Sequence, residues 1–158
     1  MLTSKTHRVH QEFLTLKTKN WPLAAIMLDL ADFVHDSFQK DVVMTMIFRT
    51  QEEQWELYKK TDGPKTKRKS PHMSWLAVDI RDRIYTSAER DQIFEFLKNH
   101  YDRTNKLNPL PSGSRTAWRH AIKGQAFHFH IQYKGPTVYV FNQGLVIRPE
   151  RIQVPANP

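Results

Sequence analysis

Two segments of the chain alternate between apolar and polar residues, which is the pattern of a β-strand with one buried face. They are residues 75–81 and residues 127–133. The apolar face would carry Leu76, Val78 and Ile80 from the first segment and Phe127, Phe129, Ile131 and Tyr133 from the second. The opposite face would carry Trp75, Ala77, Asp79 and Arg81, together with His128, His130 and Gln132. We therefore expect a sheet that packs on a core with one face and presents histidine and carboxylate side chains on the other.

The polar residues of these two strands, with His72 just ahead of the first strand, form a candidate metal site. The chain has no cysteine, so a zinc ion would have to be held by histidine and carboxylate side chains alone. His72 and Asp79 follow the spacing His-x6-Asp, and His128 and His130 follow the spacing His-x-His. Alternate histidines on a strand often only form hydrogen bonds, so it is the joint pattern that favours zinc.

Capping signals place three helices around these strands. Asn20 precedes Trp21 and Pro22, which suits a helix over residues 21–38. The sequences Thr50-x-x-Glu53 and Thr86-x-x-Glu89 are capping boxes. They predict helices from Thr50 to about residue 60 and from Thr86 to about residue 103. These helices alternate with strands along the chain, and we expect them to flank the sheet.

Further strands are predicted at residues 42–49, 116–122 and 137–141, with turns at residues 123–124 and 134–136. The expected class is α+β, with a small central antiparallel sheet whose last strands form a meander. A chain of 158 residues with 39% hydrophobic residues is long enough for one domain with its own core. We place that core at about residues 21–142, with an N-terminal arm over 1–20 and an irregular tail over 143–158.

The charge of the chain narrows the class of partner without identifying it. A formal net charge of +8 indicates attraction to a polyanion, which could be nucleic acid, an anionic membrane or a cell wall. Part of the excess is a basic run at residues 59–69 that includes Asp62, Gly63 and Pro64 and reads as an exposed loop. No nucleic-acid-binding motif is present, so specific nucleic-acid binding is not expected. We also find no apolar run long enough to span a membrane and no export signal in the first twenty residues.

One known superfamily carries the same combination of spacings. The stretch Ser70-Pro71-His72-Met73-Ser74-Trp75-Leu76-Ala77-Val78-Asp79 resembles the motif Ser-x-His-x-x-Gly-x-Ala-x-Asp of the lysostaphin, D-alanyl-D-alanine metallopeptidase and hedgehog superfamily. Arg49 and the helix around Gln54 resemble the Arg and the Glu-Gln-x-x-x-Tyr-like helix that precede this motif. The likeness covers about residues 41–133. Within the superfamily it is strongest to peptidoglycan-cleaving D-alanyl-D-alanine carboxypeptidases and L-alanyl-D-glutamate endopeptidases, including phage endolysins.

The resemblance implies a hedgehog/DD-peptidase-like fold and a zinc peptidase that acts on peptidoglycan peptides. It implies that His72, Asp79 and His130 bind Zn²⁺ and leave a fourth position open for water. His128 would transfer a proton, and Arg49 would grip a carboxylate or carbonyl of the substrate. Gln54, Ser70 and Trp75 are further expected substrate-binding residues. Such a protein, expected as a monomer, would remain in the cytoplasm until lysis, or travel in a phage particle, and act at the cell wall.

Two positions depart from the family pattern. Trp75 stands where the family has glycine, and a bulky ring there would narrow or reshape the groove. Many relatives place a glutamate shortly before the last histidine as the general base, whereas this chain has Gln125, Ala126 and Phe127. The proton-transfer role therefore passes to His128. The alternative function is a wall-binding or structural module that keeps the fold, with or without zinc, but has lost hydrolysis.

Overall fold

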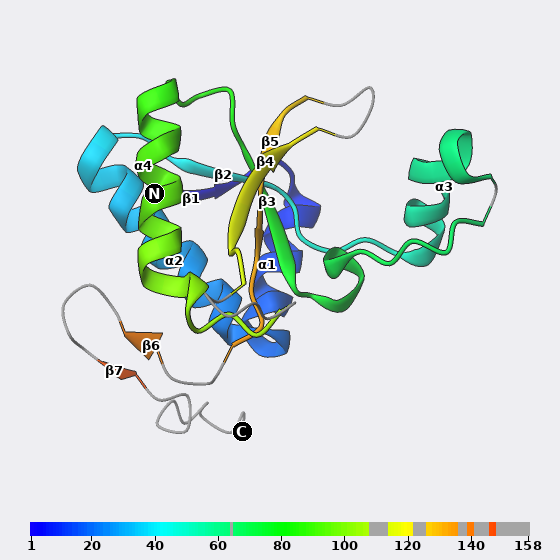
Figure 1. Cartoon of the computed structure of the whole chain (residues 1–158), viewed down its shortest axis with the longest axis horizontal. Coiled ribbons are helices and arrows are strands. Elements are labelled where there is room, and N and C mark those ends of the chain that lie inside the picture. The colour runs from blue at the N-terminus through cyan, green and yellow to red at the C-terminus, as the bar shows by residue number, and fades with distance from the viewer. Residues whose placement is uncertain (64, 108–113, 122–125, 136–138, 141–145, 148–158) are drawn as a thin grey trace.

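The computed structural model describes residues 1–63, 65–107, 114–121, 126–135, 139–140 and 146–147. Its centre is a five-stranded sheet in the order β1-β2-β3-β5-β4 (Figure 1). The strands are β1 (Leu2–Ser4), β2 (Val42–Met46), β3 (Ala77–Arg81), β4 (Ala117–His120) and β5 (His128–Gln132). Strand β1 runs parallel to β2, and the other neighbouring pairs are antiparallel. The α+β class is confirmed, but the sheet is mixed rather than wholly antiparallel as expected.

Helices cover the apolar face of this sheet. They are α1 (His7–Lys19), α2 (Trp21–Phe38) and α4 (Ser87–Leu97), with α4 continued by a π-helical turn at Lys98–Asp102. The main core cluster joins Leu23, Ile26 and Leu30 of α2 to Val78 and Ile80 of β3 and Phe129 and Ile131 of β5. The alternation predicted for both strands is thereby confirmed within their bounds. Burial of these apolar side chains is the main force that holds the sheet against the helices.

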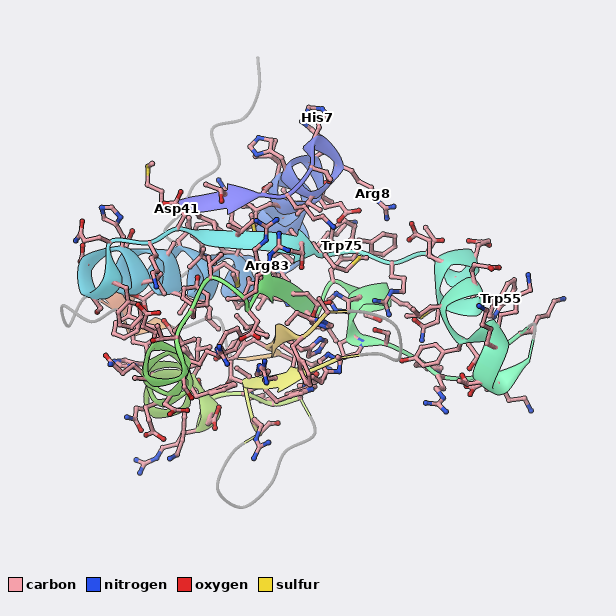
Figure 2. All side chains as sticks on the ribbon, turned by 90° about the horizontal axis from the view of Figure 1, so that it is seen from above. His7, Arg8, Asp41, Trp55, Trp75 and Arg83 are labelled. Atoms are coloured by element: carbon pink, nitrogen blue, oxygen red, sulfur yellow. The ribbon has the colours of Figure 1, made fainter. Side chains whose placement is uncertain are left out.

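Helix α3 (Gln51–Asp62) lies away from α2 and α4 (Figure 1). Figure 2 shows Trp55, on this helix, at the end of the molecule away from α2 and α4. Its first turn has the predicted capping box: the Thr50 hydroxyl accepts a hydrogen bond from the Glu53 N–H, and Glu53 accepts one from the Thr50 N–H. Gln54 is the buried residue of this helix, so α3 presents a largely polar surface to solvent.

The N-terminal segment, expected as an arm or short helix on the outside, forms β1 and α1 and contributes side chains to the core. Strand β1 pairs with β2 in register, so Leu2 lies beside Val42. Helix α1 buries Val9, Phe13 and Leu16. These three apolar residues recur at helical spacing, but the polar residues between them mask the pattern. A three-residue strand likewise has too few residues for an alternation to be recognised.

The segment around His72 also differs from the expectation. Residues Pro71–Ser74 form a 3₁₀ turn, and β3 begins only at Ala77. Trp75 therefore does not share the strand face of Asp79, and that placement is wrong. Trp75 ends the 3₁₀ turn with a backbone angle φ of 57°, in the left-handed region. Glycine adopts this conformation without strain, which explains physically why a glycine suits the position.

The C-terminal strands depart from a simple meander. Strands β4 and β5 pair as expected, but β6 (Tyr139–Val140) pairs with β7 (Val146–Ile147) in a separate two-stranded sheet. Strand β7 falls inside the segment expected to be an irregular tail. The predicted turn at residues 123–124 and residue 136 of the next predicted turn lie outside the described residues.

Candidate metal centre

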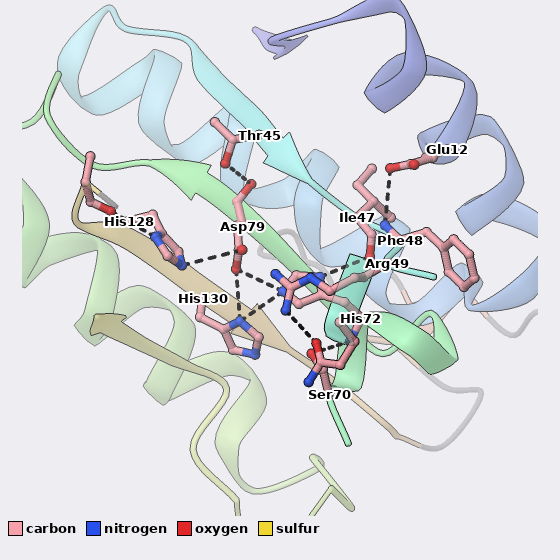
Figure 3. A network of polar contacts seen from close by, with 12 residues as sticks. Glu12, Thr45, Ile47, Phe48, Arg49, Ser70, His72, Asp79, His128 and His130 are labelled. Atoms are coloured by element: carbon pink, nitrogen blue, oxygen red, sulfur yellow. Dashed lines mark hydrogen bonds and ion pairs between the residues drawn. The ribbon is translucent and has the colours of Figure 1, made fainter. Parts of the chain in front are cut away.

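Strand pairing brings the predicted ligands together on the polar face of the sheet (Figure 3). Asp79 of β3 lies directly opposite His130 of β5, and His72 reaches the same point from the 3₁₀ turn. His130 Nδ1 lies 2.9 Å from Asp79 Oδ1, and His72 Nε2 lies 3.2 Å from both atoms. All three side chains are buried. One donor atom from each residue thus faces a common point, as three ligands of one ion must.

The hydrogen bonding of His72 suits a ligand of a metal ion at that point. Its Nδ1 lies 3.0 Å from the carbonyl oxygen of Ile47, which can only accept, so Nδ1 carries the proton. In the neutral ring, Nε2 then presents a lone pair to the Asp79 carboxylate, which is also an acceptor. Two acceptors at 3.2 Å repel each other unless a positive charge, either a proton on Nε2 or a metal ion, lies between them. A metal ion satisfies this requirement, and a histidine whose other nitrogen donates to a backbone carbonyl is the usual ligand form.

The charge states of the other two residues suit the same ligand role. Burial alone would raise the pKa of Asp79, but its contacts with His72 and His130 outweigh burial and hold the pKa well below its usual range. Burial lowers the pKa of His130, against the opposing effect of Asp79. The centre therefore holds an ionised carboxylate beside an imidazole that favours its neutral form, and these are the forms that bind zinc.

Neighbouring residues fix the ligands in place. The Thr45 hydroxyl donates to the main-chain oxygen of Asp79 at 3.2 Å. The Trp118 ring packs on the His130 ring with centroids 4.6 Å apart. Nε2 of His130 is buried and has no hydrogen-bond partner among the described residues. The His130 ring packs against the rings of Trp118 and His120. A ligand set locked in this way needs little rearrangement to bind an ion.

His128 lies beside the centre without belonging to it. Its Nε2 is 3.5 Å from Asp79 Oδ2, the oxygen that faces away from the two buried histidines. Its Nδ1 lies 3.2 Å from the Ala126 carbonyl oxygen, so Nδ1 carries the proton and Nε2 has the lone pair. His128 is half-buried, whereas His130 is 4% exposed.

An open cleft of about 750 Å³ adjoins the centre. Asp79, His128 and Arg49 are among its lining residues, whereas Gln54, Ser70 and Trp75 are not. Its cationic lining residues are Lys5, Arg49, Arg81 and Arg83. The acidic residues Glu53 and Glu56 form ion pairs with Arg8 and Lys59, which do not line the cleft. The cleft therefore presents positive charge next to the carboxylate of the metal centre.

Arg49 is held at the corner between β2 and α3, as expected. It is 7% exposed, and its Nη1 donates to Gln54 Oε1 at 3.0 Å. Gln54 Nε2 donates in turn to the Arg68 carbonyl oxygen at 3.1 Å. No carboxylate of the described residues forms an ion pair with Arg49. A buried guanidinium that is oriented by a neutral amide can bind a carboxylate of a ligand by donating hydrogen bonds to it.

Ser70 and Trp75 have structural partners at this site. The Ser70 hydroxyl accepts a hydrogen bond from the His72 N–H at 3.4 Å and caps the 3₁₀ turn. The Trp75 ring stacks on Phe48 with centroids 4.5 Å apart. Because neither side chain lines the cleft, their contact with a substrate stays a prediction.

From the sequence, Trp118 had no expected role, and His120 could lie near the site but was interpreted as structural. Strand β4 pairs with β5 so that Trp118 lies opposite His130 and His120 lies opposite His128. The sequence predicted a strand over residues 116–122 but not its register against β5. The Ile47 carbonyl was also missed, since a backbone acceptor leaves no signal in the sequence.

Comparison of the chain with protein-family models, with curated proteins and with solved structures finds no match. Among the described residues, no helix combines the length and the apolar character needed to cross a membrane.

Proposed function

We propose that this protein is a zinc peptidase that hydrolyses an amide bond in peptidoglycan stem peptides, as a DD-carboxypeptidase or an L-alanyl-D-glutamate endopeptidase does. The observation that carries the proposal is the convergence of His72, Asp79 and His130 beside an open, cationic cleft. The motif that contains these residues resembles that of peptidoglycan-cleaving enzymes. The proposal includes a hedgehog/DD-peptidase-like fold and action at the cell wall, after lysis or from a phage particle.

In this proposal His72, Asp79 and His130, whose side-chain atoms face one another, would hold the ion. Zinc bound by two histidines and one carboxylate supplies Lewis-acid polarisation of a carbonyl and activation of water. The fit rests on the donor set: an ionised carboxylate, a neutral imidazole fixed by the Ile47 carbonyl and a second imidazole whose protonation burial disfavours.

His128 is the proposed general base and acid. Its Nε2 lone pair lies on the cleft side of Asp79, 3.5 Å from Oδ2, where it can take a proton from water and pass it to the leaving amine. The nearby Asp79 carboxylate would stabilise the imidazolium that forms between these two steps. No acidic residue stands at positions 125–127, where many relatives have the glutamate base, and this favours a histidine in the role.

Arg49 is the proposed anchor for a substrate carboxylate. Its guanidinium lines the cleft, lacks an ion-pair partner among the described residues and is oriented by Gln54. Stem peptides carry free carboxylates close to their scissile bonds, and a fixed guanidinium suits them. The interaction between Arg49 and this carboxylate would hold the scissile amide in position for attack.

The competing function, a module that has lost hydrolysis, depended on Trp75 narrowing the groove. The Trp75 ring stacks on Phe48 and does not line the cleft. This placement favours the peptidase over the inactive module.

Digestion of purified peptidoglycan tests the proposal. Zinc-loaded protein should release new peptide termini, identified by mass spectrometry, and a chelator should abolish their release. His130→Ala should be inactive, whereas His100→Ala, at an exposed position on the π-helical turn, serves as the matched control and should keep wild-type activity. Wild-type protein that contains zinc but releases no termini from walls or from stem peptides would overturn the proposal in favour of the module.

A further inference from the structure

The two oxygens of Asp79 face different histidines. Oδ1 lies 2.9 Å from His130 Nδ1 and 3.2 Å from His72 Nε2. Oδ2 lies 3.5 Å from His128 Nε2. A carboxylate with partners on both oxygens can bridge two metal ions, each bound through one oxygen.

His120 forms a second group of potential ligands with Asp79 and His128. It lies opposite His128 in the β4–β5 pair, and the two ring centroids are 4.5 Å apart. Its Nε2 is buried and has no hydrogen-bond partner among the described residues. One potential ligand atom from each of Asp79, His120 and His128 lies within 4.8 Å of the other two. Buried polar atoms are usually satisfied, so an unpaired imidazole nitrogen beside two metal-ligand side chains calls for an explanation.

We propose that Asp79, His120 and His128 form a second divalent-metal site, which shares Asp79 with the first as a bridging carboxylate. Two nitrogen or oxygen ligands of a tetrahedral zinc ion lie about 3.4 Å apart. The 3.5 Å between His128 Nε2 and Asp79 Oδ2 matches that separation. The Nδ1–H of His128 donates to the Ala126 carbonyl, which leaves its Nε2 lone pair free for the ion.

The second site should bind its ion more weakly than the first. Its three ligand atoms are spread over up to 4.8 Å, whereas those of the first group lie 2.9 to 3.2 Å apart. It also shares the single negative charge of Asp79 with the first ion. In addition, the cation Arg81 lies opposite His128 on β3, which disfavours a second positive ion.

Occupation of this site would remove His128 from proton transfer, because the ion takes the lone pair that would accept the proton. Excess zinc should therefore inhibit the enzyme, and His120→Phe should abolish this inhibition. This consequence for activity rests on the proposed function. The metal site itself does not, and counting bound ions tests it separately.

The experiment is equilibrium dialysis of metal-free protein against a range of Zn²⁺ concentrations, with bound zinc measured by elemental analysis. Wild-type protein should bind two zinc ions with separable affinities, one in a tight class and one in a weak class. His120→Phe, which keeps an aromatic ring beside His128, should retain the tight class and lose the weak one. The control His100→Phe should bind as the wild type does.

Circular dichroism establishes that each variant is folded before its ions are counted. Should His120→Phe fail to fold, His128→Gln removes a different ligand of the same site and should also lose one ion while keeping the tight class. A wild type that saturates at one ion, or folded His120→Phe or His128→Gln with the same zinc content as the wild type, would overturn the second site. Either result would leave the peptidase proposal in place.

Discussion

Asp79 and His130 lie opposite each other on adjacent strands, although 51 residues separate them in the chain. The ladder between β3 and β5, rather than a loop, therefore sets the distance between two of the proposed ligands. Metal binding at such a site is coupled to the stability of the sheet, because the unfolded chain does not hold the ligands together.

The first prediction follows from this coupling. Zinc should stabilise the wild-type fold, by about 2.7 kcal/mol when free zinc is one hundred times its dissociation constant. His130→Ala should bind little zinc at the first site and lose this stabilisation. Thermal unfolding with and without zinc measures both effects. Equal stabilisation of the variant and the wild type would exclude His130 as a ligand.

The second prediction separates the two histidines of β5. His128→Ala should keep the zinc of the first site and its fold but hydrolyse stem peptides at least about 100-fold more slowly, the usual range for loss of a general base. Zinc content and kcat on one defined peptide are the measurements. Release of the tightly bound zinc by His128→Ala, together with its retention by His130→Ala, would invert the ligand assignment.

The third prediction concerns Arg49 and the amide that orients it. Arg49→Ala should keep zinc but lose activity on stem peptides, since the anchor for the carboxylate is gone. Gln54→Glu places a carboxylate where the neutral amide accepts from Arg49 Nη1, so the guanidinium becomes paired within the protein. We expect KM to rise about 10- to 100-fold, which corresponds to the loss of one charge-assisted hydrogen bond to the substrate. An unchanged KM in Gln54→Glu would show that Arg49 does not bind the substrate carboxylate.

The fourth prediction is a pH dependence of stability at the contact between α1 and α3. The hydrogen bond from Arg8 is the main cause that lowers the pKa of Glu53 from 4.5 to about 2. A carboxyl group whose pKa falls on folding stabilises the fold above its unfolded pKa. The contribution of Glu53 should therefore be complete above pH 4.5 and disappear as the pH falls to about 2.

Urea unfolding of Glu53→Gln tests this contribution. The side chain of Glu53 is 37% exposed, so the variant should lose no more than about 1 kcal/mol at pH 6. The difference from the wild type should shrink as the pH is lowered through 4. Glu56→Gln, on the same helix with an exposed partner, is the control and should show little difference at any pH. A constant deficit for Glu53→Gln would mean that packing rather than charge is responsible.

The fifth prediction assigns the basic segment after α3 to electrostatic attraction. Lys65, Lys67 and Lys69 are exposed, whereas Arg68 is held by an ion pair with Asp62. Activity on intact walls should fall as salt rises past about 0.1 M, where the Debye length is about 10 Å. Activity on small soluble peptides should change less. The same salt dependence for both substrates would argue against this role.

The features that could be predicted from sequence depend on residues close together in the chain. Asn20 with Pro22, and Thr50 with Glu53, placed the starts of α2 and α3 correctly, because capping uses atoms of one helical turn. The alternation around Asp79 and His130 also placed both side chains on the polar face. These local patterns determine which face a residue occupies.

What could not be predicted depends on pairing between distant segments. Neither the parallel partner of β1 nor the opposition of His120 and His128 follows from alternation, which fixes a face but not a register. The left-handed backbone of Trp75 was hidden because a tryptophan at positive φ is rare. Strand pairing in space was needed to bring His120 to the metal centre.

The contact between Trp118 and His130 gives the protein an intrinsic optical signal. The indole lies 4.6 Å from the imidazole, centroid to centroid, at an interplanar angle of 39°. An excited indole transfers charge to a protonated imidazole far more readily than to one whose nitrogen is bound to a closed-shell cation such as zinc. The chain has four tryptophans, and the share of the emission that comes from Trp118 therefore depends on the state of the His130 ring beside it.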